Sequence, residues 1–164
     1  MYQRILVPID GSTPSNQGLN EAIKLALLTG ARLRLIHVMG SLIYATGFGV
    51  YGDYNGDLIL RMEEAGKQVL EDGKTRATAA KLEVDSLLID GLGMRVSEAV
   101  IQQTKEWGAD LIVIGTHGRR GANRLLLGSD AEQIMRLAPV PVLLVRTPEA
   151  TAKDYVASQA QSSK

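Results

Sequence analysis

Five short apolar runs, each separated from the next by a stretch with helical spacing, constrain the fold most. The runs are rich in Val and Ile and almost continuously apolar, which is typical of strands buried on both faces of a sheet. Strands that alternate with helices in this way predict an α/β fold, a doubly wound parallel sheet with helices on both faces and right-handed crossovers. The predicted strands span 5–9, 33–38, 84–89, 110–115 and 140–145.

Four helices are predicted between these strands. The first has Thr13 as its cap and Pro14 at the first helical position, and it ends at Gly30. The other three span 57–80, 94–107 and 129–137. We expect one domain over 1–146, in which 39–56 is a flexible loop, followed by a mobile tail over 147–164.

Composition excludes several classes of function. Lys plus Arg and Asp plus Glu number 18 each, and this balance argues against a general nucleic-acid binder. The chain has no cysteine and two histidines, so thiolate sites are excluded and a histidine-built metal site is disfavoured. No apolar run approaches the ~20 residues of a membrane span, and the N-terminus lacks the apolar core of a signal peptide. We expect a soluble, cytoplasmic protein.

The segment GTHGRRGANRLLLGSDAE, residues 115–132, combines glycines, arginines and a serine. Gly115 ends the fourth predicted strand and Asp10 follows the first, and ligands of open parallel sheets bind at such carboxyl ends. Gly115 and Gly118 permit positive φ angles and a close approach of the backbone to a ligand. Successive amides in such a turn form an anion-binding nest.

Ser129 and Glu132 fit the capping-box pattern, so Ser129 is predicted as the N-cap of the last helix. The amides at a helix start favour a phosphate, and Arg119, Arg120 and Arg124 lie on the turn before it to neutralise one. An ordinary capped helix preceded by solvated arginines has the same local features. From the residues alone, both interpretations stay open.

The same segment fits the spacing G-x2-G-x9-G-S/T at Gly115, Gly118, Gly128 and Ser129. Together with RILVPIDGS at 4–12, LRLIHV at 33–38, WGADLIVIGTHGRRG at 107–121 and APVPVLLVR at 138–146, it resembles the ATP-binding branch of the universal stress protein family. The resemblance covers the chain except the central loop and the tail.

This resemblance implies a five-stranded sheet of order 3-2-1-4-5, similar to the flavodoxin and adenine-nucleotide-hydrolase folds. It also implies a regulatory, stress-response protein that binds ATP with Mg or Mn and forms a homodimer through the last strand, Val140–Val145. An apolar edge strand left unpaired is an aggregation hazard, which gives the dimer a physical reason of its own.

The resemblance also implies roles for individual residues. Asp10 contacts the ribose region, with Pro8 and Ile9 beside the nucleotide, and the backbone of Val38 meets the adenine. The ribose and phosphates are lined by Ile114, Gly115, His117, Gly118, Arg119, Gly128 and Ser129. Asp130 departs from the small or apolar residue expected there. Its carboxylate repels a terminal phosphate or reaches it through the metal, so AMP, ADP or a cyclic nucleotide stays open beside ATP.

Four functions remain as hypotheses. The first is a nucleotide-binding dimer whose surface for an unidentified protein partner depends on nucleotide state, with 39–56 as the segment that changes. The others are a scaffold dimer without nucleotide, a slow ATPase or nucleotidyl-transfer enzyme, and, ranked lowest, a phosphoacceptor receiver. No catalytic residue is predicted, because no base with an orienting partner is evident around His117.

Several residues have structural interpretations. Gly73-Lys74-Thr75 resembles the end of a P-loop but falls inside a predicted helix. The segment Gly91–Val96 begins like a dinucleotide-binding fingerprint but has Val96 in place of the third glycine, and it is predicted as a turn between the third strand and the third helix. His37 is predicted as a structural residue with a satisfied side chain, and Trp107 as core.

Overall fold

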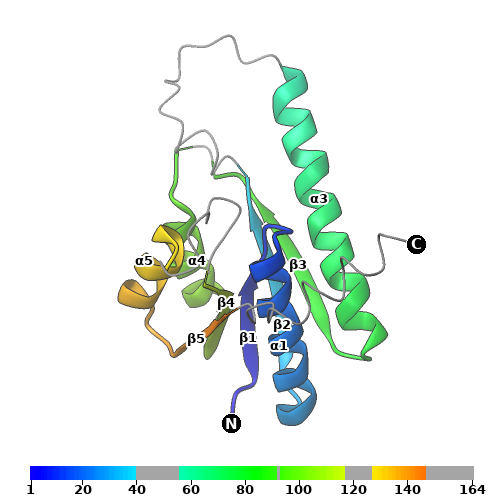
Figure 1. Ribbon diagram of the computed structural model, residues 1–164, viewed down its shortest axis with the longest axis vertical. Helices are drawn as coiled ribbons and strands as arrows, with labels where there is room; N and C mark the ends of the chain where they lie inside the picture. Colours follow the sequence, from blue (N-terminus) through cyan, green and yellow to red (C-terminus); the bar gives the residue numbers. More distant parts are fainter. Residues whose placement is uncertain (40–55, 92, 117–126, 147–164) are drawn as a thin grey trace, which may run out of the picture.

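The computed structural model describes residues 1–39, 56–91, 93–116 and 127–146, which contain a five-stranded sheet of order β3-β2-β1-β4-β5 (Figure 1). All of its strand pairs are parallel. The strands are β1 (Arg4–Pro8), β2 (Arg32–Val38), β3 (Val84–Ile89), β4 (Leu111–Gly115) and β5 (Val142–Val145). The helices are α1 (Thr13–Thr29), α3 (Gly56–Ala79), α4 (Val96–Trp107) and α5 (Ser129–Leu137). The predicted architecture and strand order are confirmed. The tail at 147–164 and nearly all of the loop predicted at 39–56 lie outside the described residues.

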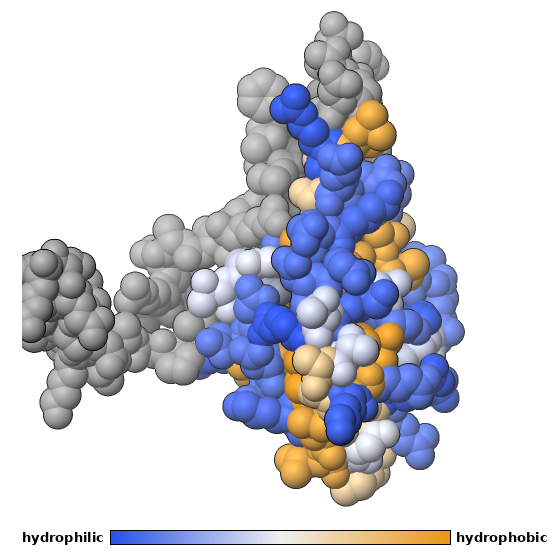
Figure 2. Space-filling model, turned by 90° about the vertical axis from the view of Figure 1, so that its right-hand side faces the viewer, coloured by the Kyte–Doolittle hydropathy of each residue, from blue (hydrophilic) through white to orange (hydrophobic). Residues whose placement is uncertain are grey.

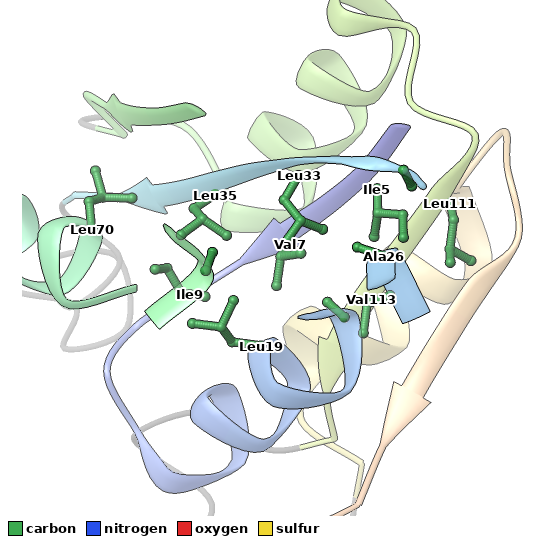
Figure 3. Packing of buried hydrophobic residues seen from close by; sticks show 13 residues of the cluster. Ile5, Val7, Ile9, Leu19, Ala26, Leu33, Leu35, Leu70, Leu111 and Val113 are labelled. Carbon is green, nitrogen blue, oxygen red and sulfur yellow. The ribbon is translucent and has the colours of Figure 1, made fainter. Parts of the chain in front are cut away.

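Two apolar layers, one on each face of the sheet, form the core. On one face α1 and α3 pack against the odd-numbered residues of β1, β2 and β4, such as Val7, Leu35 and Val113 (Figure 3). On the other face α4 and α5 pack against the even-numbered residues, such as Leu6 and Ile112. This alternation explains why the strands read as continuous apolar runs, because both faces of each are covered.

Helix α1 begins one residue earlier than predicted. The N-cap of α1 is Ser12, not Thr13, since the Ser12 side chain accepts a hydrogen bond from the amide of Ser15. The proline therefore lies one position deeper in the first turn, where its missing N–H still costs no helical bond. At the other end Gly30 terminates α1 as predicted, with φ 72° and its amide bonded to the Ala26 carbonyl.

The long helix α3 approaches the sheet through glycines. Its buried residues recur at Gly66, Leu70, Gly73 and Ala77, so Gly73 belongs to a helix seam and not to a P-loop. A Cβ on Gly73 would lie 2.9 Å from the side chains of Ile9 and Leu35.

The start of helix α3 projects beyond the sheet (Figure 1). Seen from the side of α3, the surface mixes hydrophilic and hydrophobic residues (Figure 2).

Trp107, predicted as core, is half-buried and carries a stacked cation. The Arg34 guanidinium lies 4.8 Å from the centre of the Trp107 ring. It also donates two hydrogen bonds of 2.7 and 2.8 Å to the Asp85 carboxylate on the neighbouring strand. These hydrogen bonds, with the opposite charge of Asp85, raise the pKa of Arg34 against the lowering effect of burial. The indole therefore stacks on the arginine of an ion pair that joins β2 to β3.

Candidate functional site

The strand order creates one switch point, between β1 and β4. From β1 the chain proceeds outward to β2 and β3, and it then returns to the other side of β1 for β4 and β5. The register pairs Ile5 with Leu111 and Leu6 with Ile112, so the carboxyl ends of β1 and β4 are neighbours. Ligands of open α/β sheets bind at this kind of edge. The structure thus brings the predicted residues after β1 and at the end of β4 to one edge of the sheet.

The turn after β1 holds Asp10 through hydrogen bonds at its backbone and its side chain. The Asp10 amide donates to the Ser15 hydroxyl at 3.0 Å, and one carboxylate oxygen accepts from the Ser12 amide at 2.9 Å. Gly11 follows with φ 79°, a conformation that favours glycine. The half-buried carboxylate is therefore fixed by the first turn of α1 rather than left to rotate in solvent.

Pro8 and Ile9 precede this turn at the end of β1. Ile9 is buried, and its amide donates to the Ile36 carbonyl at 2.8 Å, which continues the β1–β2 pairing past the end of the strand. The imidazole of His37 contacts the other side of the same residue, with Nδ1 at 2.7 Å from the Ile9 carbonyl oxygen. The prediction that His37 has a satisfied structural side chain is confirmed.

Gly115 ends β4, and its missing side chain has a packing role that the sequence did not reveal. It is not among the described glycines with positive φ, so the conformational freedom that glycine permits is not used here. A Cβ at this position would lie 2.4 Å from the Pro14 carbonyl oxygen and 3.0 Å from the Ser15 amide nitrogen. The missing side chain lets the first turn of α1 rest on the end of β4. A Cβ on Gly18, one turn later, would lie 3.0 Å from the Gly115 nitrogen.

The start of α5 is tied to the end of β4. The Gly128 amide donates to the Thr116 carbonyl at 2.8 Å, and the Thr116 amide donates to Val145 at 3.0 Å. The predicted cap is wrong, because Gly128 is the N-cap and Ser129 is the first helical residue. The extended backbone of Gly128 makes it the flanking residue, and its carbonyl accepts the first helical bond from Glu132.

This shift frees the Ser129 hydroxyl from the capping role. Ser129 is exposed, and its hydroxyl makes no hydrogen bond to any other residue that the structure describes. The first amides of α5 have no carbonyl partners within the helix. Asp130, the departure noted above, is exposed in the same first turn. A hydroxyl and helix-start amides are thus presented together, which suits an anionic ligand.

The end of β2 is covered by the turn after β3. Val38 is 7% exposed, and the next amide, of Met39, donates to the Ile89 carbonyl at 2.8 Å. A Cβ on Gly91 would lie 2.3 Å from the Met39 carbonyl oxygen and 2.5 Å from a Val38 methyl group. Gly93 has φ 90°, as expected of the predicted turn. The close contact of Gly91 was missed because its partner is on another strand.

Part of the predicted site lies outside the described residues. This applies to His117, Gly118 and Arg119, and to Arg120 and Arg124. The predicted anion nest and its arginines therefore remain predictions. The residues that the structure does describe form the frame around that segment: the β1 turn on one side, and the ends of β4 and α5 at its two attachment points, Thr116 and Leu127.

A cavity of about 340 Å³ adjoins the β1 turn on the side of α3. Its described lining consists of Gly11, Ser12, Asn16, Val69 and Asp72. Asn16 is held there by Arg76 of α3, which donates to its side-chain oxygen at 2.8 Å. The lining residues carry one carboxylate and no cation, so the cavity does not suit the phosphates themselves.

Within the described parts of the chain, no three side chains of His, Cys, Asp or Glu come together as a metal site. No described helix is both long and apolar enough to cross a bilayer.

Known proteins resemble this chain over most of its length. A universal stress protein of Thermus aquaticus is 36% identical over 151 residues, which cover 89% of this chain and 100% of the relative. A solved structure from the same family, from Burkholderia pseudomallei, is 32% identical with a TM-score of 0.70, covering 88% of this chain and 96% of the other.

Some structural neighbours were solved with adenine nucleotides. A universal stress protein from Archaeoglobus fulgidus in complex with dAMP is 24% identical with a TM-score of 0.62, over 87% of this chain and 97% of its own. A universal stress protein in complex with cAMP has 24% identity and a TM-score of 0.62, over 90% of this chain and 98% of its own. One from Arabidopsis thaliana with AMP bound has 15% identity and a TM-score of 0.64, over 90% and 93%. At these identities the likeness shows the fold alone. The model of the universal stress protein family matches residues 1–146, and the chain belongs to that family.

Proposed function

We propose that this chain binds an adenine nucleotide, with ATP as the first candidate, at the switch point between β1 and β4. The observation that carries the proposal is the free hydroxyl of Ser129 at the start of α5, on the same sheet edge as the fixed carboxylate of Asp10. The adenine nucleotides bound by structural neighbours support it. In this arrangement Asp10 meets the ribose hydroxyls, and the α5 amides meet the phosphates.

A metal ion fits this proposal without a protein-built cage. Mg²⁺ bound with ATP takes most of its ligands from phosphate oxygens and water, and often only one or two from the protein. Ser129 and Asp130, neighbours in the first turn of α5, are the described residues with oxygen atoms at that place. We propose a regulatory role for this binding, in keeping with the family to which the chain belongs.

Ser129→Ala tests the site. The hydroxyl is exposed and unbonded, so the free energy of unfolding should change by less than about 0.5 kcal/mol. Nucleotide binding should weaken about tenfold, because a hydrogen bond to a charged phosphate is lost. Isothermal titration calorimetry with Mg-ATP, ADP, AMP and cAMP measures both the affinity and the preferred phosphate count. Mass spectrometry of small molecules released from the purified protein identifies a co-purified nucleotide.

Thr75→Ala is the matched control, since Thr75 also has an exposed hydroxyl group and lies in the C-terminal half of α3. Its affinity should equal that of the unaltered protein. If the unaltered protein binds none of the four nucleotides, and none is released from it, the proposal fails. Equal affinity of Ser129→Ala and Thr75→Ala would remove Ser129 from the site.

We also propose that the protein forms a homodimer through β5. In the described sheet β5 is an outer strand that pairs only with β4, and its Leu143 is 37% exposed. Apolar edge strands are commonly covered or paired. Leu143→Lys should therefore convert a dimer to a monomer in sedimentation velocity. Leu28→Lys, at a residue that is 79% exposed on α1, is the control and should leave the dimer intact. A monomeric unaltered protein would refute this proposal.

A further inference from the structure

His37 lies where three elements meet at the edge of the candidate site. It is the next-to-last residue of β2, between the buried residues Ile36 and Val38. The alternation of the strand puts it on the same face as Leu33 and Leu35, which is the face covered by α1 and α3. Its imidazole therefore lies between the end of β1 and helix α3.

The hydrogen bond to β1 has a defined direction. A carbonyl oxygen can only accept, so at 2.7 Å from the Ile9 oxygen the Nδ1 atom must carry the proton. The Ile9 amide already donates to Ile36. Both polar backbone atoms of Ile9 are thus bonded to β2, one through the main chain and one through this side chain.

The bonded carbonyl belongs to the peptide group that joins Ile9 to Asp10. The N–H of the same group donates to the Ser15 hydroxyl at 3.0 Å. His37 and Ser15 therefore hold this peptide plane from opposite ends. Rotation of the plane would move the Asp10 side chain, whose carboxylate is the proposed ribose contact.

Helix α3 provides the space that the imidazole needs. A Cβ on Gly66 would lie 2.8 Å from His37 Cδ2 and 2.7 Å from a Leu88 methyl carbon. Glycine inside a helix is unfavourable relative to alanine, so a packing reason accounts for it at this contact. The ring thus has little room to move away from the Ile9 carbonyl.

We propose that His37 is a positioning residue for nucleotide binding, which acts by fixing the Ile9–Asp10 peptide from β2 and α3. The inference rests on the proposed function. It assigns to His37 no contact with the ligand. Its donor at Nδ1 is the essential feature, so a side chain with an N–H at the same distance from the backbone should replace it.

The experiment compares His37→Asn with His37→Leu. The Asn amide nitrogen occupies nearly the position of Nδ1, whereas Leu fills space without a donor. Isothermal titration calorimetry with Mg-ATP should show about a tenfold loss of affinity for His37→Leu and recovery to within about threefold for His37→Asn, as expected for one hydrogen bond. Val100→Ala, in the core on the opposite face, controls for lowered stability and should keep full affinity.

A measurement on the unaltered protein covers the case in which His37→Leu does not fold. Nitrogen-15 NMR of the imidazole, at a pH where the ring is neutral, should show the proton on Nδ1. The Nε2–H tautomer would overturn the inference, as would equal affinity of folded His37→Leu and the unaltered protein. Absence of nucleotide binding by the unaltered protein is a separate result, which refutes the proposed function itself.

Discussion

Gly115→Ala is expected to lower the free energy of unfolding by about 3 kcal/mol, at the upper end of the usual cost of overpacking. The added Cβ would lie 2.4 Å from the Pro14 oxygen and 2.6 Å from the Pro14 carbonyl carbon. Both are backbone atoms in the first turn of α1, so the clash is relieved only if the helix start moves. Thermal unfolding followed by circular dichroism should show a midpoint lower by about 6–12 °C.

The matched control is Gly30→Ala at the other end of the same helix. Its Cβ would have no neighbour within 4 Å, and only the positive φ of 72° is strained. This strain costs about 1 kcal/mol. If Gly115→Ala were as stable as Gly30→Ala, the close packing of α1 on β4 would not be the reason for glycine at 115. A second effect separates the variants, because displacement of α1 moves Ser15 and with it Asp10, so Gly115→Ala should also bind Mg-ATP more weakly.

Gly91→Ala is expected to lower the free energy of unfolding by about 2 kcal/mol and nucleotide affinity by about tenfold. The new Cβ would meet the Met39 oxygen at 2.3 Å and a Val38 methyl group at 2.5 Å. The end of β2 then has to move away from the turn after β3. Since the resemblance to the family implies that the Val38 backbone meets the adenine, its displacement should affect binding as well as stability. Chemical denaturation and calorimetry measure the two effects separately.

Gly93→Ala, two residues along the same turn, is the control. Gly93 has φ 90° and no atom within 4 Å of a built Cβ, so its substitution introduces strain without a clash. Its affinity for nucleotide should stay unchanged while its stability falls by about 1 kcal/mol. If both variants bound nucleotide as tightly as the unaltered protein, the end of β2 would not be part of the nucleotide site.

The strands were predictable because the apolar residues that mark them are adjacent in the sequence and face both sides of the sheet. The prediction 84–89 coincides with β3, and the other four strands overlap their predictions within two residues at each end. Residues such as Leu6 and Val7 face opposite sides, and both sides are buried, so the run is apolar throughout. A pattern of this kind survives small errors at the ends. Pro141 shows one such error, since the last strand begins only after it, at Val142.

The glycines were harder to interpret, because the same residue type serves different physical needs. Gly115 was expected to permit a positive φ and a close approach of the backbone to a ligand, and the structure adds a second need, because the missing side chain makes room for the first turn of α1. Gly66 carried no recognised signal, and Gly73 was noted only for its likeness to the end of a P-loop, although both glycines form the seam of α3 on the sheet. Caps failed for a related reason. Ser12 and Thr13 both suit an N-cap, as do Gly128 and Ser129, and only the hydrogen bonds select between them.

The sequence by itself determined the α/β class, the alternation of strands and helices, and the presence of an Asp after the first strand and a Gly-Ser pair at the start of the last helix. These follow from the order of residues along the chain, which is local information. Only the tertiary structure decided that the His37 imidazole reaches the Ile9 carbonyl and that Gly91 lies against Val38. Both contacts join segments that are far apart in the sequence and lie at the ends of neighbouring strands. Their distances depend on how closely the strands and helices pack, which the order of residues along the chain does not give.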